Sequence, residues 1–363
     1  IKIEHQIPPK GKCYLKLFYY LKKEEGLLAS NHLLGMDEIR LKNEDGRNQF
    51  VCRWLDSKEK EAEAIQKQLE YQETSDRFII KGEGFCYIFN KEKGIFETID
   101  YHGYQYLDSA IQFNIWRAPT DNDRYMKEEW KKAGYNRAYS RVYECKASFS
   151  EGTDNKYGKL IINVKAGIVS EVVPRILSLD IIWTVNVQGD IVMQLKGEKN
   201  MDLPPLPRLG LRLFLPRKME NVSYFGIGPE ESYIDKCRAG SHGLYYAKID
   251  QLYKKYIKPQ ENGSHYDCDY VDVNDSTYGI MVMSDKGFSF NASIFTQEEL
   301  ESKRHDFELE ESGCSIICLD YRQNGIGSRS CGPELLDKYQ FDEENFSFDV
   351  ILSPYMINTT SEN

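Results

Sequence analysis

The sequence predicts an all-β chain made mainly of antiparallel β-sandwiches. Apolar and polar residues alternate in many short runs, which is the pattern of a half-buried strand. Clusters of Gly, Asp and Asn separate these runs, and few stretches show the 3.6-residue period of an amphipathic helix. The chain also holds 25 tyrosines among 363 residues, and tyrosine favours half-buried pleated surfaces. Together these features indicate a sandwich architecture.

The first elements expected along the chain are strands at 13–22 (CYLKLFYYLK) and 50–55 (FVCRWL), because both runs alternate. Residues 58–70 (KEKEAEAIQKQLE) favour a helix by propensity. Their apolar positions are too sparse for a buried stripe, so we expect a solvated connection or an edge strand there. Residues 85–99 (FCYIFNKEKGIFETI) predict a β-hairpin with NKEKG as its turn.

A strand, a turn and a capped helix are predicted around the run NIWRAPTDND (114–123). The strand covers 106–115, and Pro119 removes a backbone donor just after it. The short polar side chains of 121–123 favour a turn and a helix N-terminus. The helix that follows would place its apolar residues on one face and end at a glycine; these residues are Met126, Trp130, Ala133 and Gly134.

Further strands are predicted at 159–167, 177–197, 278–295 and 314–321, with a tight turn at 188–190. A domain boundary is expected near residues 80–84, where two glycines follow a polar stretch. The chain would then divide into an N-terminal part, 1–82, and a large β domain, 83–363.

The composition argues against several classes of partner. The net charge is −10 and no basic block gathers the 47 Lys and Arg residues, so neither nucleic acid nor a membrane is an expected partner. No run approaches the roughly 20 apolar residues that cross a bilayer, and the N-terminus lacks the apolar core of a signal peptide. Nine cysteines without a CxxC pair favour free thiols in a reducing, cytoplasmic compartment.

The sequence shows no motif for a bound metal or a nucleotide. The histidines are scattered, without HExxH or a zinc-type Cys–His spacing. The run HYDCD could place His265, Asp267 and Asp269 on one face of a strand, but a structural role is favoured for them. We therefore expect no cofactor in this chain.

Polar residues gather in four stretches that we expect to form loops: 121–123, 229–235, 259–263 and 329–334. Loops rich in Glu, Asn, Arg and Tyr at the end of a sandwich are suited to binding hydroxyl groups. Loops of this composition are more often ordinary surface.

Ordered motifs in the chain resemble the C-terminal region of bacterial β-galactosidases of glycoside hydrolase family 2. The motifs are WRAPTDND (116–123), RLGLRLFLP (208–216), YFGIGPEESYIDK (224–236), PQENG (259–263) and NGIGSRSCGPE (324–334). The resemblance implies that 1–82 form a partial immunoglobulin-like sandwich lacking its first strands. It implies that 83–363 form a large galactose-mutarotase-like β-supersandwich, the small-chain domain.

The resemblance also implies a function. In that family two glutamates on a TIM barrel, with Mg²⁺ nearby, hydrolyse β-galactosides with retention, and the barrel is absent from this chain. No Glu here can inherit those roles, so the chain alone is expected to be inactive. It would supply a wall of the active site and bind the barrel, the N-terminal domains, the galactoside and further copies in a homo-oligomer.

Candidate residues follow from the same motifs. Some family members carry a Trp near position 331 that stacks on the sugar, and Cys331 would lose that stacking. The candidates for substrate contact are Arg329, Ser330, Cys331, Glu230, Glu261 and Asn262. The residues expected to pack, pair, cap or orient are Trp116, Arg117, Asp121, Asn122 and Asp123.

An alternative is an autonomous protein, either mutarotase-like or sugar-binding. A mutarotase needs a general acid and a general base on opposite sides of the sugar. His242 or His265 could pair with Glu230 or Glu261 in these roles, although nothing in their spacing supports it. A pure scaffold without sugar contact is a third possibility.

Overall fold

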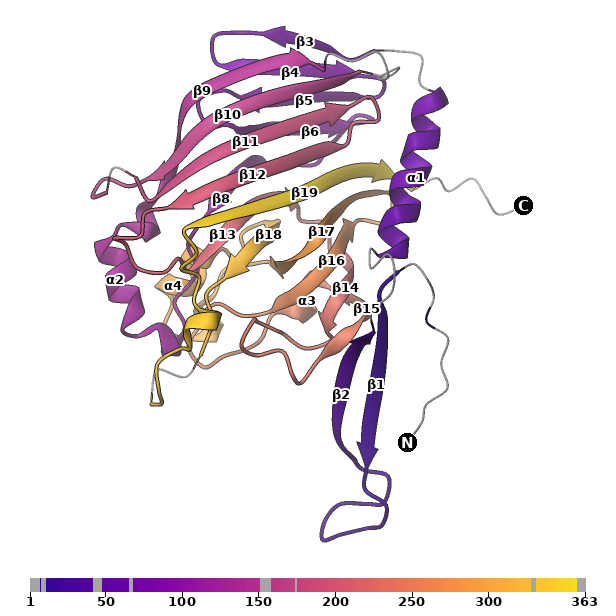
Figure 1. The fold of residues 1–363 in the computed structure, drawn as a ribbon, viewed down its shortest axis with the longest axis vertical. Helices are drawn as coiled ribbons and strands as arrows, with labels where there is room; N and C mark the ends of the chain where they lie inside the picture. Colours follow the sequence, from indigo (N-terminus) through magenta and orange to yellow (C-terminus); the bar gives the residue numbers. More distant parts are fainter. Residues whose placement is uncertain are drawn as a thin grey trace.

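A computed structural model describes residues 7, 11–41, 48–64, 68–150, 158–173, 175–327 and 331–357. Within these ranges the chain is mostly β, as predicted, and its strands form three antiparallel sheets (Figure 1). A two-stranded sheet pairs β1 (Cys13–Tyr20) with β2 (Leu33–Leu41). A five-stranded sheet consists of β3 (Glu70–Glu73), β4 (Arg77–Gly82), β5 (Phe85–Asn90), β6 (Ile95–Tyr101) and β7 (Tyr104–Gln105).

The third sheet has 12 strands and runs through most of the molecule. Its main path is β15-β14-β16-β17-β19-β12-β11-β10-β9, and β18, β13 and β8 branch from β17. Its strands are β8 (Ser109–Asn114), β9 (Tyr139–Phe149), β10 (Lys159–Val169), β11 (Leu177–Asn186), β12 (Ile191–Lys199), β13 (Arg208–Pro216), β14 (Asn221–Gly228), β15 (Ser241–Lys248), β16 (Ser264–Asn274), β17 (Tyr278–Ser293), β18 (Cys314–Gln323) and β19 (Asn345–Met356).

One main core runs through the molecule, and part of it lies between the five-stranded sheet and the β9–β12 part of the large sheet. Trp183 on β11 makes edge-to-face contacts with Phe89 and Phe96, at ring-centroid distances of 6.3 and 5.3 Å. Its indole N–H donates to the carbonyl of Gly94 in the β5–β6 turn, at 3.1 Å. Alternate residues of β10, β11 and β12 are buried, so the alternation in the sequence corresponds to the two faces of a sandwich.

The helices are few and mostly short. They are α1 (Gln49–Ala64), α2 (Met126–Lys132), α3 (Ile249–Leu252) and α4 (Gln297–Ser302), with 3₁₀ turns η1 (Asp121–Asp123), η2 (Tyr135–Arg137), η3 (Asp306–Glu308) and η4 (Asp337–Tyr339). Within the described ranges, no helix is long and apolar enough to cross a bilayer.

Helix α1 corrects two predictions. The strand expected at 50–55 was wrong, because residues 49–64 are helical. The connection or edge strand expected at 58–70 was wrong for 58–64, which continue the helix that their propensity favoured, and residue 70 begins the edge strand β3. Val51, Trp54 and Leu55 fall on one helical face, and they pack with Tyr270 and Met283 of the large sheet. The Trp54 indole N–H also donates to Ser353 Oγ at 3.1 Å. Packing of these side chains on the large sheet therefore favours a helix over a strand for this run.

Other local predictions are confirmed. The hairpin at 85–99 is β5–β6, and the turn at 188–190 has Gly189 in the left-handed region at φ +86°. The strand expected at 106–115 is shorter, since β8 spans Ser109–Asn114. Helix α2 follows η1, buries Trp130 and is followed by Gly134 at φ +74°.

The described residues up to 82 include the β1–β2 hairpin, which extends away from the body, then α1 and two strands of the five-stranded sheet (Figure 1). The boundary expected near 82 falls in the turn between β4 and β5, which pair directly. Strands from both sides of this position therefore share one sheet, and the division into two domains stays a prediction.

Candidate functional site

The four polar stretches predicted from the sequence meet in one pocket of about 650 Å³. Asn122 comes from η1, Asp235 from the β14–β15 loop, Gln260 from the loop before β16, and Pro333 from the segment between β18 and η4. The pocket is lined by Thr120, Asn122, Asp235, Lys236, Tyr256, Gln260, Glu261, Ile326, Gly327, Pro333, Glu334, Leu335, Leu336 and Tyr339.

The WRAPTDND stretch is held by a buried ion pair at one side of this pocket. Arg117 donates from Nη2 to Asp123 Oδ1 at 2.7 Å and from Nε to Oδ2 at 3.2 Å. Asp123 Oδ2 also accepts the backbone N–H of Thr120 at 2.8 Å. Trp116 is buried beside Trp130, and its indole N–H donates to Glu301 at 2.9 Å. Trp116 therefore packs and Arg117 pairs within the same short stretch.

The segment 324–327 is fixed to the pocket by three side chains. Arg117 donates to the carbonyls of Asn324 at 2.6 Å and Gly325 at 3.1 Å. Asn122 Nδ2 donates to the carbonyl of Ile326 at 2.8 Å. The Asp235 carboxylate accepts the N–H of Ile326 at 3.1 Å and of Gly327 at 2.7 Å. The motifs at 116–123 and 224–236 thus position the segment that precedes the candidate residues 329–331.

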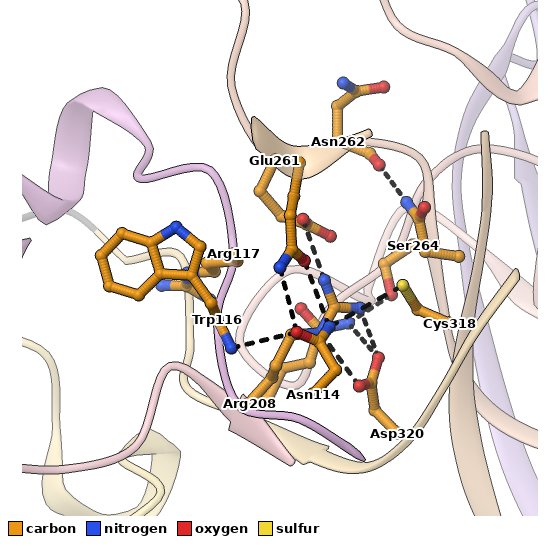
Figure 2. Close-up of polar contacts among 12 residues, drawn as sticks. Asn114, Trp116, Arg117, Arg208, Glu261, Asn262, Ser264, Cys318 and Asp320 are labelled. Carbon is orange, nitrogen blue, oxygen red and sulfur yellow. Dashed lines mark hydrogen bonds and ion pairs between the residues drawn. The ribbon is translucent and has the colours of Figure 1, made fainter. Parts of the chain in front are cut away.

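A second buried ion cluster lies behind the pocket (Figure 2). Arg208, on β13, lies between Asp320 and Glu261 in this view. Arg208 donates to both oxygens of Asp320, at 2.9 and 2.5 Å, and to Glu261 Oε2 at 3.1 Å. All three side chains are at least 96% shielded from solvent. The cluster ties β13, β18 and the PQENG loop together.

Burial dominates the pKa values of the two carboxyl groups in this cluster. It raises the pKa of the Glu261 carboxyl despite the nearby Arg208, and it raises the pKa of Asp320. Burial alone would lower the pKa of Arg208, but Asp320 and Glu261 outweigh it and hold that pKa well above its usual value. Glu261 Oε1 is buried without a hydrogen-bond partner among the described residues. Arg208 is thus shared by two carboxyl groups.

The PQENG loop contacts both clusters through backbone and side-chain bonds. The N–H of Glu261 donates to the carbonyl of Ala118 at 3.0 Å, and Gln260 Oε1 accepts the N–H of Asp121 at 3.0 Å. Asn262 Oδ1 accepts the N–H of Lys254 at 2.8 Å. These contacts set the loop beside η1 at the pocket.

The predicted substrate contacts are dispersed around the pocket. Glu261 lines it, whereas the buried Asn262 lies behind it in a small cavity next to Arg208. Glu230 is exposed and pairs with Lys254. Cys331 is exposed, and Arg329 and Ser330 lie outside the described residues. Their contacts with substrate stay predictions.

The histidines considered as mutarotase-type catalysts have other partners. His265 Nδ1 lies 3.0 Å from the Tyr224 hydroxyl, and burial lowers the pKa of His265 to about 4. His242 lies between Glu38 and Asp267, at 2.5 and 2.9 Å. Neither histidine hydrogen-bonds Glu230 or Glu261 in the described part of the chain, so the structure does not bring together an acid–base pair from these four residues.

Sequence reasoning missed several residues of the site. Arg208 and Asp320 were not singled out, although an arginine in the apolar run RLGLRLFLP signals a buried pair. Tyr256 lines the pocket but stands outside the recognised motifs. No three His, Cys, Asp or Glu side chains among the described residues form a group that could hold a metal ion.

The fold and site define an all-β sandwich with a loop-built pocket, made from motifs that occur in order along the chain. The chain belongs to the β-galactosidase small-chain family, whose model matches residues 81–352. A β-galactosidase of Actinobacillus pleuropneumoniae is 40% identical over 340 residues, covering 93% of this chain and 32% of that protein. A β-galactosidase of Staphylococcus xylosus is 32% identical over 304 residues, covering 84% and 30%. The chain thus spans about a third of the length of these curated relatives.

Solved structures show lower similarity. A galactose 1-epimerase of Lactobacillus acidophilus aligns with a TM-score of 0.40 and 7% identity, covering 80% of this chain and 99% of the epimerase. An α-mannosidase of Enterococcus faecalis V583 aligns with a TM-score of 0.40 and 9% identity, covering 96% of this chain and 36% of the mannosidase.

Proposed function

We propose that this chain is the C-terminal, non-catalytic part of a β-galactosidase of glycoside hydrolase family 2, which hydrolyses terminal β-D-galactosides. The family match over 81–352 supports it. The observation that carries it is the alignment with the Actinobacillus pleuropneumoniae β-galactosidase, which covers 93% of this chain and 32% of the relative. A longer polypeptide of that kind has room for a catalytic domain.

In this proposal the reacting groups lie outside the chain. Retaining glycoside hydrolysis uses one carboxyl group as nucleophile and another as acid and base. Two glutamates of a barrel domain would take these roles, with Mg²⁺ bound in the same domain. The buried carboxyl groups behind the pocket are instead both paired with Arg208.

The contribution of this chain is a wall that orients the sugar. Asn122, Gln260 and Tyr256 place amide and hydroxyl groups at the pocket, and these groups can bond sugar hydroxyls. The ring of Tyr339 can cover the apolar face of a pyranose. Holding the substrate in one geometry accelerates its reaction without a reacting group from the wall. Arg329, Ser330 and Cys331 are proposed to contact the sugar.

The further partners follow from the same proposal. The barrel and N-terminal domains would cover this chain, and the whole enzyme would form a homo-oligomer. We also propose a reducing, cytoplasmic location, since the nine cysteines are free thiols and several of them are partly exposed.

An immunoblot of the source cells with antibody against this chain tests the proposal. A band well above 100 kDa is expected, and the polypeptide captured by the antibody should hydrolyse nitrophenyl β-D-galactoside. The recombinant 363-residue chain should show no hydrolysis under the same conditions.

Two results would contradict the proposal. One is hydrolysis by the recombinant chain itself. The other is a band near 42 kDa with no barrel-bearing partner in the captured material.

A further inference from the structure

The β1–β2 hairpin is joined to the body by side chains and forms no backbone ladder with another strand of the described part. Lys16 Nζ donates to Ser241 Oγ at 2.9 Å and to the carbonyl of His242 at 2.5 Å. Lys12 pairs with Asp269 on β16. A two-stranded hairpin is only marginally stable by itself, so these contacts decide whether the hairpin stays ordered.

His242 on β15 is the centre of this junction. Its Nδ1 lies 2.5 Å from Glu38 Oε1 on β2, and its Nε2 lies 2.9 Å from Asp267 Oδ2 on β16. The backbone N–H of His242 donates to Glu38 Oε2 at 2.9 Å. Tyr14 on β1 stacks on the imidazole with a centroid distance of 4.4 Å. One side chain therefore contacts both hairpin strands and β16.

The two carboxylates require two donors from the ring. A neutral imidazole carries one N–H and presents a lone pair at its other nitrogen. If His242 were neutral, that lone pair would face a carboxylate oxygen at hydrogen-bond distance, which is repulsive. The imidazolium donates from both nitrogens, so the observed geometry fits the protonated ring.

We propose that His242 is a proton-controlled latch that docks the β1–β2 hairpin on the sandwich when its ring is protonated and frees one carboxylate when it is neutral. Release of Glu38 would remove a contact between the hairpin and β15. Release of Asp267 would remove the side-chain bond between β15 and β16, which are separated by β14 in the sheet. In either case the junction loses a charge-assisted bond.

The direction of the pH effect follows from the groups around the ring. Burial alone would lower the pKa of His242, but the bonds to Asp267 and Glu38 outweigh it and raise that pKa. The stabilisation is therefore complete below the ordinary histidine pKa of about 6.5 and is lost as the pH rises through the raised value. Burial would raise the pKa of Asp267, but His242 and Lys12 lower it, so this carboxylate stays charged.

The charged and titratable groups near the junction come from every element that packs there. They are Lys12, Tyr14, Lys16, Glu38 and Arg40 from the hairpin and its approach, Cys237 and Tyr245 near and on β15, and Asp267 and Asp269 on β16. Burial raises the pKa of the Tyr14 hydroxyl and of the Cys237 thiol. The imidazole of His242 is the kind of side chain whose ordinary pKa lies nearest neutral pH.

Hydrogen exchange of the full chain, followed by mass spectrometry from pH 6 to 9, tests the latch. The amide exchange rates of residues 13–41 are divided by those of residues 159–186. The division removes the effect of pH on the exchange chemistry itself, which is the same for both segments. As the pH rises from 6 to 9, this ratio should increase. The total increase should be about tenfold for each pH unit by which the pKa of His242 exceeds its ordinary value. In His242→Gln the ratio should not change with pH. In His32→Gln, which alters an exposed residue of the same hairpin, the rise should match the unaltered chain.

Asp267→Asn provides a second variant, because Asn tolerates the left-handed backbone found at this position, φ +52°. Losing this carboxylate lowers the pKa of His242, so the rise should move to lower pH. A ratio that is constant from pH 6 to 9 in the unaltered chain would overturn the latch. The latch would also be overturned if the ratio in His242→Gln rose with pH as it does in the unaltered chain, while residues 159–186 kept their normal protection from exchange.

Discussion

At the scale of single residues, Arg208 is the cation that makes two buried carboxyl groups tolerable behind the pocket. It reaches Asp320 and Glu261 from β13, and none of the three is exposed. Charges in such a place are costly unless they are paired. The motif RLGLRLFLP therefore supplies the cation that pairs with the buried carboxyl groups of Glu261 and Asp320.

Replacement of Arg208 by Ala should lower the free energy of unfolding by about 3–5 kcal/mol, because two buried carboxyl groups would lose their cation. Urea denaturation at neutral pH measures the change. Arg217→Ala is a suitable control, since Arg217 lies just after the same strand in partly exposed pairs with Glu220 and Glu311. Its cost should be below about 1 kcal/mol. Equal costs in the two variants would contradict the role given to Arg208.

Residue composition was enough to predict polar loops, and the pocket gathers members of all four. It could not say which polar groups face the cavity and which are consumed by partners. Glu230 and Glu261 are similar in the sequence, yet one pairs with Lys254 at the surface and the other with Arg208 in the interior. That difference arises from contacts between segments far apart in the chain.

At the scale of elements, the segment 324–327 lies outside the strands. It is held by backbone bonds from Asn324 and Gly325 to the carbonyls of Pro207 and Tyr339 and by side chains from two other loops. Among these side chains, Asp235 accepts hydrogen bonds from two successive backbone N–H groups, those of Ile326 and Gly327. Hydrogen bonds to a charged group each contribute about 1.5–3 kcal/mol.

Replacement of Asp235 by Ala should accelerate hydrogen exchange at Ile326 and Gly327 by about tenfold or more, because both amides lose a charged acceptor. Mass spectrometry of peptides over 322–340 measures this. Asp180→Asn, at an exposed position of β11, should leave these peptides unchanged. Exchange that stays slow in the Asp235 variant would mean that the segment is held without this carboxylate.

Helix α1 shows where an element could not be assigned from the sequence. The run at 50–55 supports both an alternating strand and a helical stripe, because it holds adjacent apolar residues. The partners that favour the helix, Tyr270, Met281 and Met283, lie on β16 and β17 much later in the chain. The hairpin at 85–99 was predictable because its partner strand follows within a few residues.

At the scale of the whole molecule, the pocket is a single open wall. An open wall makes few of the contacts of a closed site, so the isolated chain should bind galactose with a Kd of about 1 mM or weaker. Isothermal titration measures this. The longer polypeptide should bind more tightly.

Tyr339→Ala removes a pocket-lining ring and should weaken that binding further. Tyr246→Ala removes a ring that is 74% exposed on β15 and should leave it unchanged. Equal effects of the two substitutions would place the sugar elsewhere.

Strand β19 has a consequence for how the molecule is made. Residues 345–352 pair with β12 and residues 351–356 pair with β17, so this strand joins the two halves of the large sheet. During synthesis β12 and β17 leave the ribosome before β19. The edges that pair with β19 therefore stay unpaired until residues 345–356 have emerged. Open edges invite pairing with other chains. We therefore expect folding of the large sheet to finish late in translation, and a nascent chain stalled before residue 345 to be a target for chaperones.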